Sequence, residues 1–261
     1  MSNQRRIRAK VCLVGDCGVG KTSLIRRLLH DEFNERYVPT PSTEVSKVEY
    51  RFLANPDSEV VLEMDIWDIT GQKAFRKFLS DSYFYNSRSI VAVCDATRKS
   101  TLEEIEEWVD AGRRIAGDIP THTLANKMDL EDRVVLNDVL IKKICNKLNS
   151  SVFFVSAKTG ANVDLVFQMI AEKVLENAMA ELEENEKILR QQWEILSATA
   201  QRGRFGASKE FFFTTMKGIG FDTLKFHVEE LEKKGYLKVV WNDPTNFVAY
   251  ATEAGIERAE L

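Results

Sequence analysis

The chain has 261 residues, of which 44% are hydrophobic and 29% are charged, and its formal net charge is −4. This composition provides enough apolar side chains for a folded core and excludes a globally disordered chain, while the length allows one large domain or two smaller ones. Because no run of about 18 apolar residues occurs, we expect no transmembrane helix. We find no secretory signal and no myristoylation or prenylation motif, so we expect a cytoplasmic protein without a lipid anchor.

The cysteines and histidines argue against a disulfide framework and against a metal cluster. The four cysteines form no CxxC pair, which is typical of a protein of the reducing cytosol; they are Cys12, Cys17, Cys94 and Cys145. The three histidines lie far apart in the sequence; they are His30, His122 and His227. The pattern predicts no zinc-type site.

Charge is spread unevenly along the chain. Residues 1–162 carry 24 basic and 23 acidic side chains, residues 163–200 carry 3 and 8, and residues 201–261 carry 9 and 9. No segment is the basic block that indicates nucleic-acid binding.

Between residues 5 and 160, apolar runs alternate with helical patterns. The predicted strands are 11–14, 60–62 with 66–67, 90–94, 121–125 and 152–155, and the helices lie near 21–33, 101–116 and 136–149. Continuous apolar runs are typical of strands covered on both faces, as in a parallel sheet. Residues 45–53 and 59–67 indicate a hairpin that carries one antiparallel edge strand. We therefore predict a doubly wound α/β domain.

Residues 163–199 contain no glycine or proline, and their pattern is helical throughout. Apolar residues recur there at heptad spacing with one polar interruption, at Leu175, Met179, Leu182, Glu186, Leu189, Trp193 and Leu196. We favour a last domain helix that runs on as a linker over residues 163–200; a paired coiled coil is the alternative.

Residues 201–261 change in character. Gly203 breaks the helix, and Ser208 can cap a short one. Asp222 is expected to cap a helix over 223–234, which stops at Gly235, and strands are expected at 236–241 and 247–251. The order is helix–turn–helix followed by a two-stranded wing.

A glycine-rich loop follows the strand predicted at 11–14 and opens the next helix. It fits G-x-x-x-x-G-K-[ST] and runs Gly15, Asp16, Cys17, Gly18, Val19, Gly20, Lys21 and Thr22, with Ser23 next. The glycines let backbone N–H groups turn toward phosphates without a Cβ in the way, and the helix N-terminus adds partial positive charge. Lys21 would reach the β- and γ-phosphates and the Thr22 hydroxyl would ligate Mg²⁺. The loop predicts a nucleoside triphosphate site.

Two further loops indicate the base. Asn126, Lys127 and Asp129 follow the strand predicted at 121–125, and Ser156, Ala157 and Lys158 follow 152–155. The Asp129 carboxylate can accept two hydrogen bonds from guanine N1–H and its exocyclic amine, whereas adenine offers no such pair of donors. The Lys127 stem and Phe33 can cover the two faces of the base, and the loop at 156–158 offers a backbone N–H to guanine O6. These loops predict guanine rather than adenine.

With Trp67, Asp68, Ile69, Thr70, Gly71 and Gln72, these motifs make residues 5–175 resemble the Ras-like small GTPases, in motif style the Rab type. The resemblance implies a six-stranded, mostly parallel sheet with helices on both faces, bound GTP or GDP with Mg²⁺, and GTP hydrolysis. It also implies roles for individual residues. Asp68 would hold Mg²⁺ through water, the Gly71 N–H would contact the γ-phosphate, and Gln72 would orient the attacking water.

One segment resembles the first switch of that family, a loop that responds to the γ-phosphate; its residues are Phe33, Tyr37, Pro39 and Thr40. The resemblance implies that Thr40 would complete the Mg²⁺ shell. Thr43 is the alternative for that role. Unlike the family's usual sequence, Pro41 follows Thr40 and restricts its backbone. Neither switch offers an obvious arginine for catalysis, since Arg76 is expected on an exposed helix. The resemblance therefore implies slow turnover, an activating protein, an exchange factor and an effector.

Residues 201–261 resemble winged-helix domains of prokaryotic regulators, a fusion that suggests a prokaryotic or archaeal source. A DNA-binding role would rest on Thr223, Lys225 and His227, but the helix also carries Glu229, Glu230 and Glu232 and the segment has no net charge. We favour protein interaction over DNA. The expected protein is a GTP-dependent switch with an acidic helix and a small α+β module; the alternative is a transcription regulator whose DNA affinity depends on the nucleotide.

Overall fold

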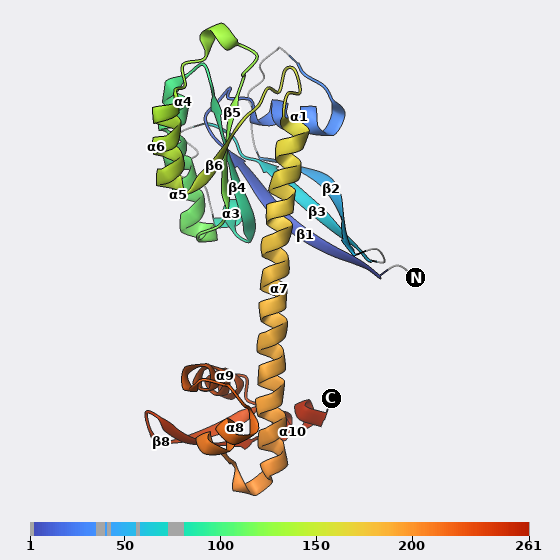
Figure 1. Cartoon of the computed structure of the whole chain (residues 1–261), viewed down its shortest axis with the longest axis vertical. Helices are drawn as coiled ribbons and strands as arrows, with labels where there is room; N and C mark the ends of the chain where they lie inside the picture. The colour runs from blue at the N-terminus through green and yellow to red at the C-terminus, as the bar shows by residue number, and fades with distance from the viewer. Residues whose placement is uncertain (1–2, 35–39, 41–42, 56–57, 73–80, 261) are drawn as a thin grey trace. The chain divides into compact units, whose positions relative to one another are not determined.

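The computed structural model describes residues 3–34, 40, 43–55, 58–72 and 81–260. The chain forms two compact units, Met1–Ala178 and Met179–Leu261 (Figure 1). Among the helices of the described residues, none is both long and apolar enough to cross a bilayer.

The first unit contains a six-stranded sheet in the order β2-β3-β1-β4-β5-β6. Its strands are β1 Asn3–Val14, β2 Glu44–Asn55, β3 Ser58–Asp68, β4 Ser87–Asp95, β5 Thr121–Asn126 and β6 Ser150–Phe154. Only the edge strand β2 runs antiparallel to its neighbour, and the other pairs are parallel. The predicted six-stranded, mostly parallel sheet is confirmed.

Helices cover both faces of this sheet (Figure 1). They are α1 Lys21–His30, α3 Asp81–Phe84, α4 Lys99–Glu103, α5 Ile105–Ala116, α6 Asp138–Leu148 and α7 Val163–Arg202, with a 3₁₀ turn at Glu131–Arg133. One apolar core packs α1 and the start of α7 against one face, around Leu24, Met64 and Phe167. The other packs α3 to α6 against the opposite face, around Phe84 and Trp108. Burial of both faces is what the continuous apolar strands indicated.

Several element ends differ from the sequence prediction for local reasons. β1 begins at Asn3 rather than near residue 11, because its polar first half pairs with β3 along its whole length and ion pairs join the two strands, such as Arg6 to Glu63 at 2.6 Å. α1 ends at His30 instead of continuing to 33, because Asp31 adopts the left-handed conformation that terminates helices. The helix predicted over 101–116 is two helices that meet at Glu104.

The second unit starts within α7 and adds a small antiparallel sheet. After a 3₁₀ turn at Gly203–Phe205 come β7 Ala207–Ser208, α8 Lys209–Thr215, α9 Phe221–Lys233, β8 Leu237–Asp243, β9 Asn246–Ala251 and α10 Glu253–Glu260. The sheet order is β7-β9-β8. Ile195 and Leu196 of α7 share a buried core with Phe212, Leu224 and Phe247, so the last turns of α7 belong structurally to this unit.

The predicted start of α9 needs correction. Asp222 does not cap α9: the helix begins at Phe221, two residues before the predicted start at 223, and its N-cap is Gly220 in an extended conformation. Two short elements were not predicted: β7, which is only two residues long, and α10, which at eight residues is too short for a clear helical periodicity. Ser208 does cap α8, since its hydroxyl accepts a hydrogen bond from the Phe211 N–H at 3.3 Å.

The heptad residues of α7 have different environments. Leu175 packs on the core of the first unit and Leu196 is buried in the core of the second, whereas Leu189 and Trp193 are more than half exposed. Some heptad residues of α7 therefore pack within one unit or the other, whereas Leu189 and Trp193 leave apolar surface exposed.

His122 is a polar residue inside the sheet. It lies on β5, is 8% exposed, and neither ring nitrogen has a hydrogen-bond partner among the described residues. Burial, with a smaller contribution from the nearby charge of Lys173, lowers its pKa from 6.5 to about 4. The folded protein therefore holds His122 neutral at pH values where the unfolded chain binds a proton.

We predict that this residue makes the fold sensitive to acid. The free energy of unfolding should be unaffected by His122 protonation above pH 6.5 and should fall as the pH drops toward 4, by about 2 kcal/mol at pH 5. Urea unfolding of the wild type and His122→Leu at pH 7.5 and pH 5 measures the effect. The variant should lose markedly less stability between the two pH values; an equal loss in both proteins would contradict the prediction.

Candidate nucleotide site

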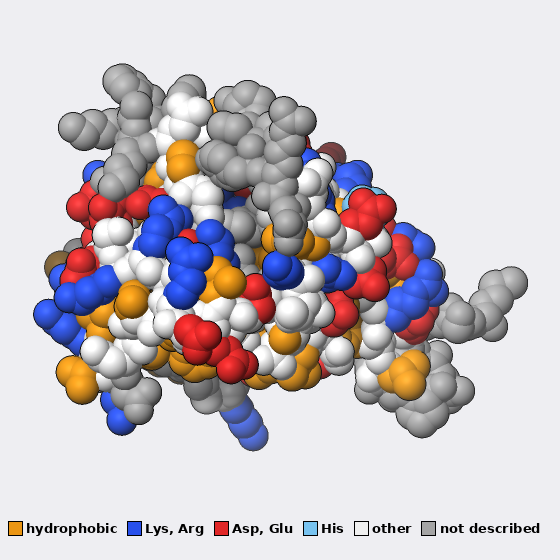
Figure 2. Space-filling view, turned by 90° about the horizontal axis from the view of Figure 1, so that it is seen from above, with side chains coloured by type: hydrophobic (Ala, Val, Ile, Leu, Met, Phe, Trp, Pro, Cys, Tyr) orange, Lys and Arg blue, Asp and Glu red, His pale blue; other side chains and the backbone are white. Residues whose placement is uncertain are grey.

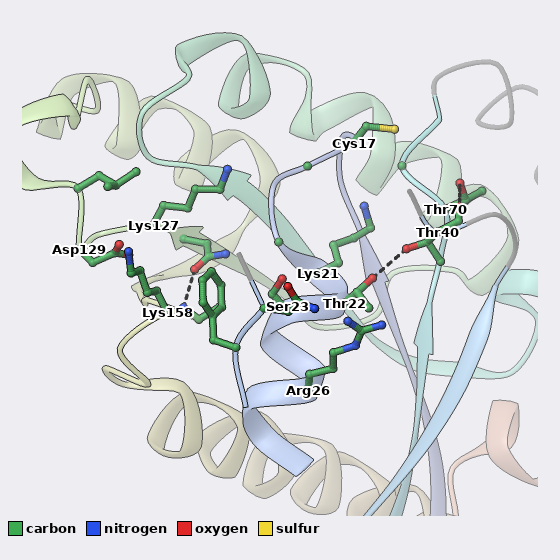
Figure 3. Close-up of a pocket in the computed structure, with 18 of the residues that line it drawn as sticks. Cys17, Lys21, Thr22, Ser23, Arg26, Thr40, Thr70, Lys127, Asp129 and Lys158 are labelled. Atoms are coloured by element: carbon green, nitrogen blue, oxygen red, sulfur yellow. Dashed lines mark hydrogen bonds between the residues drawn. The ribbon is translucent and has the colours of Figure 1, made fainter. Parts of the chain in front are cut away.

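A pocket of about 620 Å³ opens at the carboxyl ends of the parallel strands. It is lined by the loop after β1, the start of α1, and the loops after β3, β5 and β6 (Figure 3). Its described lining includes five cationic side chains and one acidic side chain, namely Lys21, Arg26, Lys127, Arg133, Lys158 and Asp129. Figure 2 looks onto this end of the molecule and shows Lys and Arg side chains near the middle of the face. The pocket is therefore suited to a polyanion.

The glycine-rich loop can adopt its path only without side chains at two positions. Gly15 has φ +135°, and an added Cβ would lie 2.2 Å from the Val93 carbonyl oxygen. Gly20 has φ +101°, and a Cβ there would lie 2.2 Å from Nδ2 of Asn126. The loop thus packs directly on β4 and on the end of β5, which leaves its inner side open to phosphate groups.

Lys21 points along this loop. Its Nζ donates to the carbonyl oxygens of Gly15 at 2.7 Å and Asp16 at 3.1 Å. Burial lowers the pKa of Lys21, and the negative charge of Asp68 opposes that shift. A desolvated ammonium held at the mouth of the loop is available to anionic oxygens.

Three oxygen-bearing side chains gather beside Lys21. The Thr22 hydroxyl lies 2.9 Å from the Thr40 hydroxyl (Figure 3). The Thr22 hydroxyl also donates to Oδ2 of Asp68. Oδ1 of Asp68 is buried and has no hydrogen-bond partner among the described residues. Burial raises the pKa of Asp68, which the Thr22 hydrogen bond partly offsets. Hydroxyl and carboxylate oxygens are ligands that Mg²⁺ prefers, so these residues fit that ion.

Thr40 rather than Thr43 takes the place beside Thr22. The Thr70 hydroxyl donates to the Thr40 carbonyl oxygen at 3.1 Å, which joins the segment at Thr40 to the loop after β3. Thr43 lies just before β2 and does not line the pocket. Tyr37, Pro39, Pro41 and Arg76 lie outside the described residues.

The opposite end of the pocket presents the residues expected around a base. Asn126 donates to the Val19 carbonyl oxygen at 2.9 Å and accepts from the Ala157 N–H at 3.0 Å, so it joins three loops. The Ser156 hydroxyl donates to Oδ1 of Asp129 at 2.6 Å and fixes that carboxylate. Phe33 lines the same pocket and is 37% exposed.

The backbone N–H groups near residue 157 are already engaged. Ser156 donates to the Ala161 carbonyl oxygen at 3.1 Å, and Ala157 donates to Asn126. A bond from Ala157 to a base would therefore have to compete with Asn126.

The loop after β3 lies against the glycine-rich loop. A Cβ added to Gly71 would meet the Asp16–Cys17 peptide, at 2.5 Å from the Asp16 carbonyl carbon. Gln72 and Thr70 also line the pocket. Most of the expected site residues that the structure describes line this one pocket, including Ser23, Cys17 and Gly18 of the loop–helix junction. Of the described residues, the expected ones outside its lining are Gly15, Asp16, Val19, Asp68 and Ser156.

Sequence reasoning missed three residues that support the site. The Trp108 indole Nε1 donates to Oδ1 of Asp16 at 2.9 Å, and both side chains are buried. Asp95 accepts from Nζ of Lys127 at 2.7 Å and from Nε of Arg98 at 2.9 Å. Asp95 ends the buried strand β4, directly after the apolar run at 90–94, and could have been noticed for that reason. Arg98 and Trp108 carry no such signal.

Comparison with known proteins agrees with this geometry. A family model described as the Ras family matches residues 10–176. The chain is 33% identical to Ras-related protein Rab-7b of Bos taurus over 70% of this chain and 90% of that protein. It is 30% identical to the Ypt/Rab-type GTPase YPT7 of Saccharomyces cerevisiae, over 70% of this chain and 89% of that protein. It is also 30% identical to the GTP-binding nuclear protein GSP1 of Encephalitozoon cuniculi, over 64% and 77% respectively.

The pocket combines a glycine-rich phosphate loop, clustered hydroxyl and carboxylate oxygens, and a fixed acidic side chain at its far end. The residues that the family model matches include those that line this pocket. The chain belongs to the Ras family and is a GTPase.

Proposed function

We propose that the protein is a guanine-nucleotide switch that binds GTP or GDP with Mg²⁺ and hydrolyses GTP slowly. It would signal through two switch segments, residues 34–43 and 69–84, and through its second unit. The observation that carries this proposal is the shared pocket, in which the phosphate loop at 15–22 and the fixed Asp129 carboxylate face one cavity.

Asp129 supplies the base preference in this proposal. Its carboxylate is held by Ser156 at one oxygen and retains capacity to accept from guanine N1–H and the exocyclic amine. Adenine would leave the carboxylate without those donors, at a cost on the order of 1–3 kcal/mol for each missing bond. Lys127 and Phe33 would cover the two faces of the ring.

The phosphates would occupy the loop side of the pocket. Lys21 would contact the β- and γ-phosphates, and Thr22, Thr40 and Asp68 would hold Mg²⁺, Asp68 through water. The bound ion would supply charge neutralisation on the phosphate oxygens. Gln72 would orient a water molecule whose oxygen bonds to the γ-phosphorus while the bond from that phosphorus to the β–γ bridging oxygen breaks, giving GDP and phosphate.

We expect slow hydrolysis because no arginine of this chain is assigned to stabilise charge on the γ-phosphate. Of the described residues that line the pocket, Lys21 is the cation assigned to the β- and γ-phosphates, and we assign no arginine to the γ-phosphate. An activating protein that supplied an arginine could accelerate hydrolysis roughly 10³–10⁵-fold. The proposal therefore includes an activating protein, an exchange factor and an effector as partners.

For the second unit we propose a winged-helix-like interaction module. In this reading residues 5–175 form the GTPase domain, 163–200 the extended helix and 201–261 the module. Its element order of two short helices followed by a β8–β9 hairpin supports the likeness.

The geometry of α9 favours a protein partner over DNA. His227, one of three residues on which DNA contact would rest, is 2% exposed and its Nε2 lies 2.9 Å from Oε1 of Gln191. Lys225 lies over the Trp241 ring at 5.3 Å and 3.9 Å from Glu229, so its charge is partly compensated. Phe226 on the same helix is about half exposed, so this part of α9 presents an apolar side chain rather than a cation to solvent.

We predict that Asp129→Ala abolishes the preference for guanine. The wild type should bind GDP far more tightly than ADP, and the variant should lose at least tenfold in GDP affinity with little change for ADP, because only guanine uses this carboxylate. Isothermal titration of both nucleotides measures this. A wild type that preferred ADP, or a variant with unchanged preference, would overturn the base assignment.

We predict that Gln72→Leu slows hydrolysis at least tenfold in single-turnover assays with bound GTP, because the attacking water loses its orienting group. GTP affinity should change less than threefold, since Gln72 is not assigned to binding. Equal hydrolysis rates in the two proteins would show that Gln72 has no catalytic role.

We predict that duplex DNA does not bind in a nucleotide-dependent way. Fluorescence anisotropy with the GTP- and GDP-loaded protein at 50 mM and 150 mM salt tests this, because phosphate contacts make DNA affinity strongly dependent on salt. Affinity that rises at low salt and differs between the two nucleotide forms would favour the regulator alternative.

A further inference from the structure

A buried carboxylate links the two ends of the nucleotide pocket. Asp95, at the end of β4, is 2% exposed and its four hydrogen bonds occupy both oxygens. Oδ1 accepts from the Thr97 N–H at 2.9 Å and the Thr97 hydroxyl at 2.7 Å. Oδ2 accepts from Nε of Arg98 at 2.9 Å and from Nζ of Lys127 at 2.7 Å. Burial disfavours the charge of Asp95, but the bonds from Lys127 and Thr97 outweigh it and hold its pKa below the usual range.

Arg98 reaches the phosphate loop from this carboxylate. Its Nη2 donates to the Cys17 carbonyl oxygen at 3.1 Å. Its backbone is fixed, since its N–H donates to the Asp95 carbonyl oxygen at 2.9 Å and its own carbonyl oxygen accepts from the Thr101 hydroxyl at 2.7 Å. The guanidinium fork can therefore contact Asp95 and Cys17 at the same time.

Lys127 reaches the same carboxylate from the base end. Its backbone has φ +70°, and its side chain lines the nucleotide pocket. The Ala96 N–H donates to the Asn126 carbonyl oxygen at 2.8 Å and fixes the preceding residue. The position of the Lys127 stem is therefore set by Asp95, the residue that also anchors Arg98.

We propose that Arg98 is a positioning residue that, through Asp95, couples the phosphate loop at Cys17 to the base-binding Lys127. This inference rests on the proposed function, because it concerns the same nucleotide site. Since both cations share one oxygen of Asp95, moving either one changes the position and charge balance of the other. When GDP or GTP binds, its contact with the phosphate loop and its contact with Lys127 then strengthen each other through Asp95.

GDP affinity and GDP dissociation rate of Arg98→Ala test the proposal, with a fluorescent GDP analogue and excess Mg²⁺. We expect about tenfold weaker binding, mostly from faster dissociation, because a charge-assisted bond to the loop is lost. Arg98→Lys should show a similar loss, since a single ammonium cannot reproduce the fork between Asp95 and Cys17. Lys99→Ala is the matched control: it removes the next cation along the chain, an exposed partner of Glu103, and should bind GDP as the wild type does.

A double-mutant cycle separates coupling from general loosening of the fold. Lys127→Ala should also weaken GDP binding, and Arg98→Ala combined with Lys127→Ala should lose at least threefold less than the product of the two single effects. Thermal unfolding without nucleotide shows whether each variant is folded.

Independent effects that simply multiply, or an Arg98→Ala affinity within twofold of the wild type, would overturn the coupling. Full rescue by Arg98→Lys would also overturn it. A wild type that failed to bind GDP would instead contradict the proposed function.

Discussion

Close packing of a glycine backbone against the ends of two strands is the constraint on which the nucleotide site depends. Gly15 touches β4 and Gly20 touches Asn126 of β5 so closely that a single Cβ would not fit at either position. This contact fixes the loop that carries Lys21 and the start of α1. It also brings Asn126 to the Val19 carbonyl oxygen, so the loop that faces phosphates and the loop that faces the base are held by the same residues.

The parallel sheet explains why these loops share one pocket. The carboxyl ends of neighbouring parallel strands lie at the same edge, where ligands bind in open α/β sheets. Three buried acids lie near that edge, namely Asp16, Asp68 and Asp95. Asp16 accepts from Trp108, Asp68 accepts from Thr22, and Asp95 accepts from Lys127 and Arg98. Each buried charge is thus hydrogen-bonded, and the lining that faces the cavity stays predominantly cationic.

The second unit has a core of its own, although it shares α7 with the first. Ile195 and Leu196 are buried with residues of α8, α9 and β9, and the ring of Phe212 lies 6.1 Å from that of Phe247. The same packing buries His227, which the sequence offered as a surface residue of α9. His227 lies three residues after Leu224 and four before Leu231, which is the spacing of the buried face of α9, and its Nε2 lies 2.9 Å from Oε1 of Gln191 of α7.

The sequence alone determined the order of the elements, the antiparallel edge strand and the phosphate and base loops, because these depend on local periodicity and on short motifs. It did not determine the break at Glu104, the start of α9, the existence of α10 or the burial of His122 and His227. Only the tertiary structure brought Arg98, Asp95 and Lys127 together, since Arg98 and Lys127 lie 29 positions apart and meet through strand pairing between β4 and β5. Contacts of this kind depend on register and on side-chain direction across neighbouring strands, and neither leaves a periodic pattern in the chain.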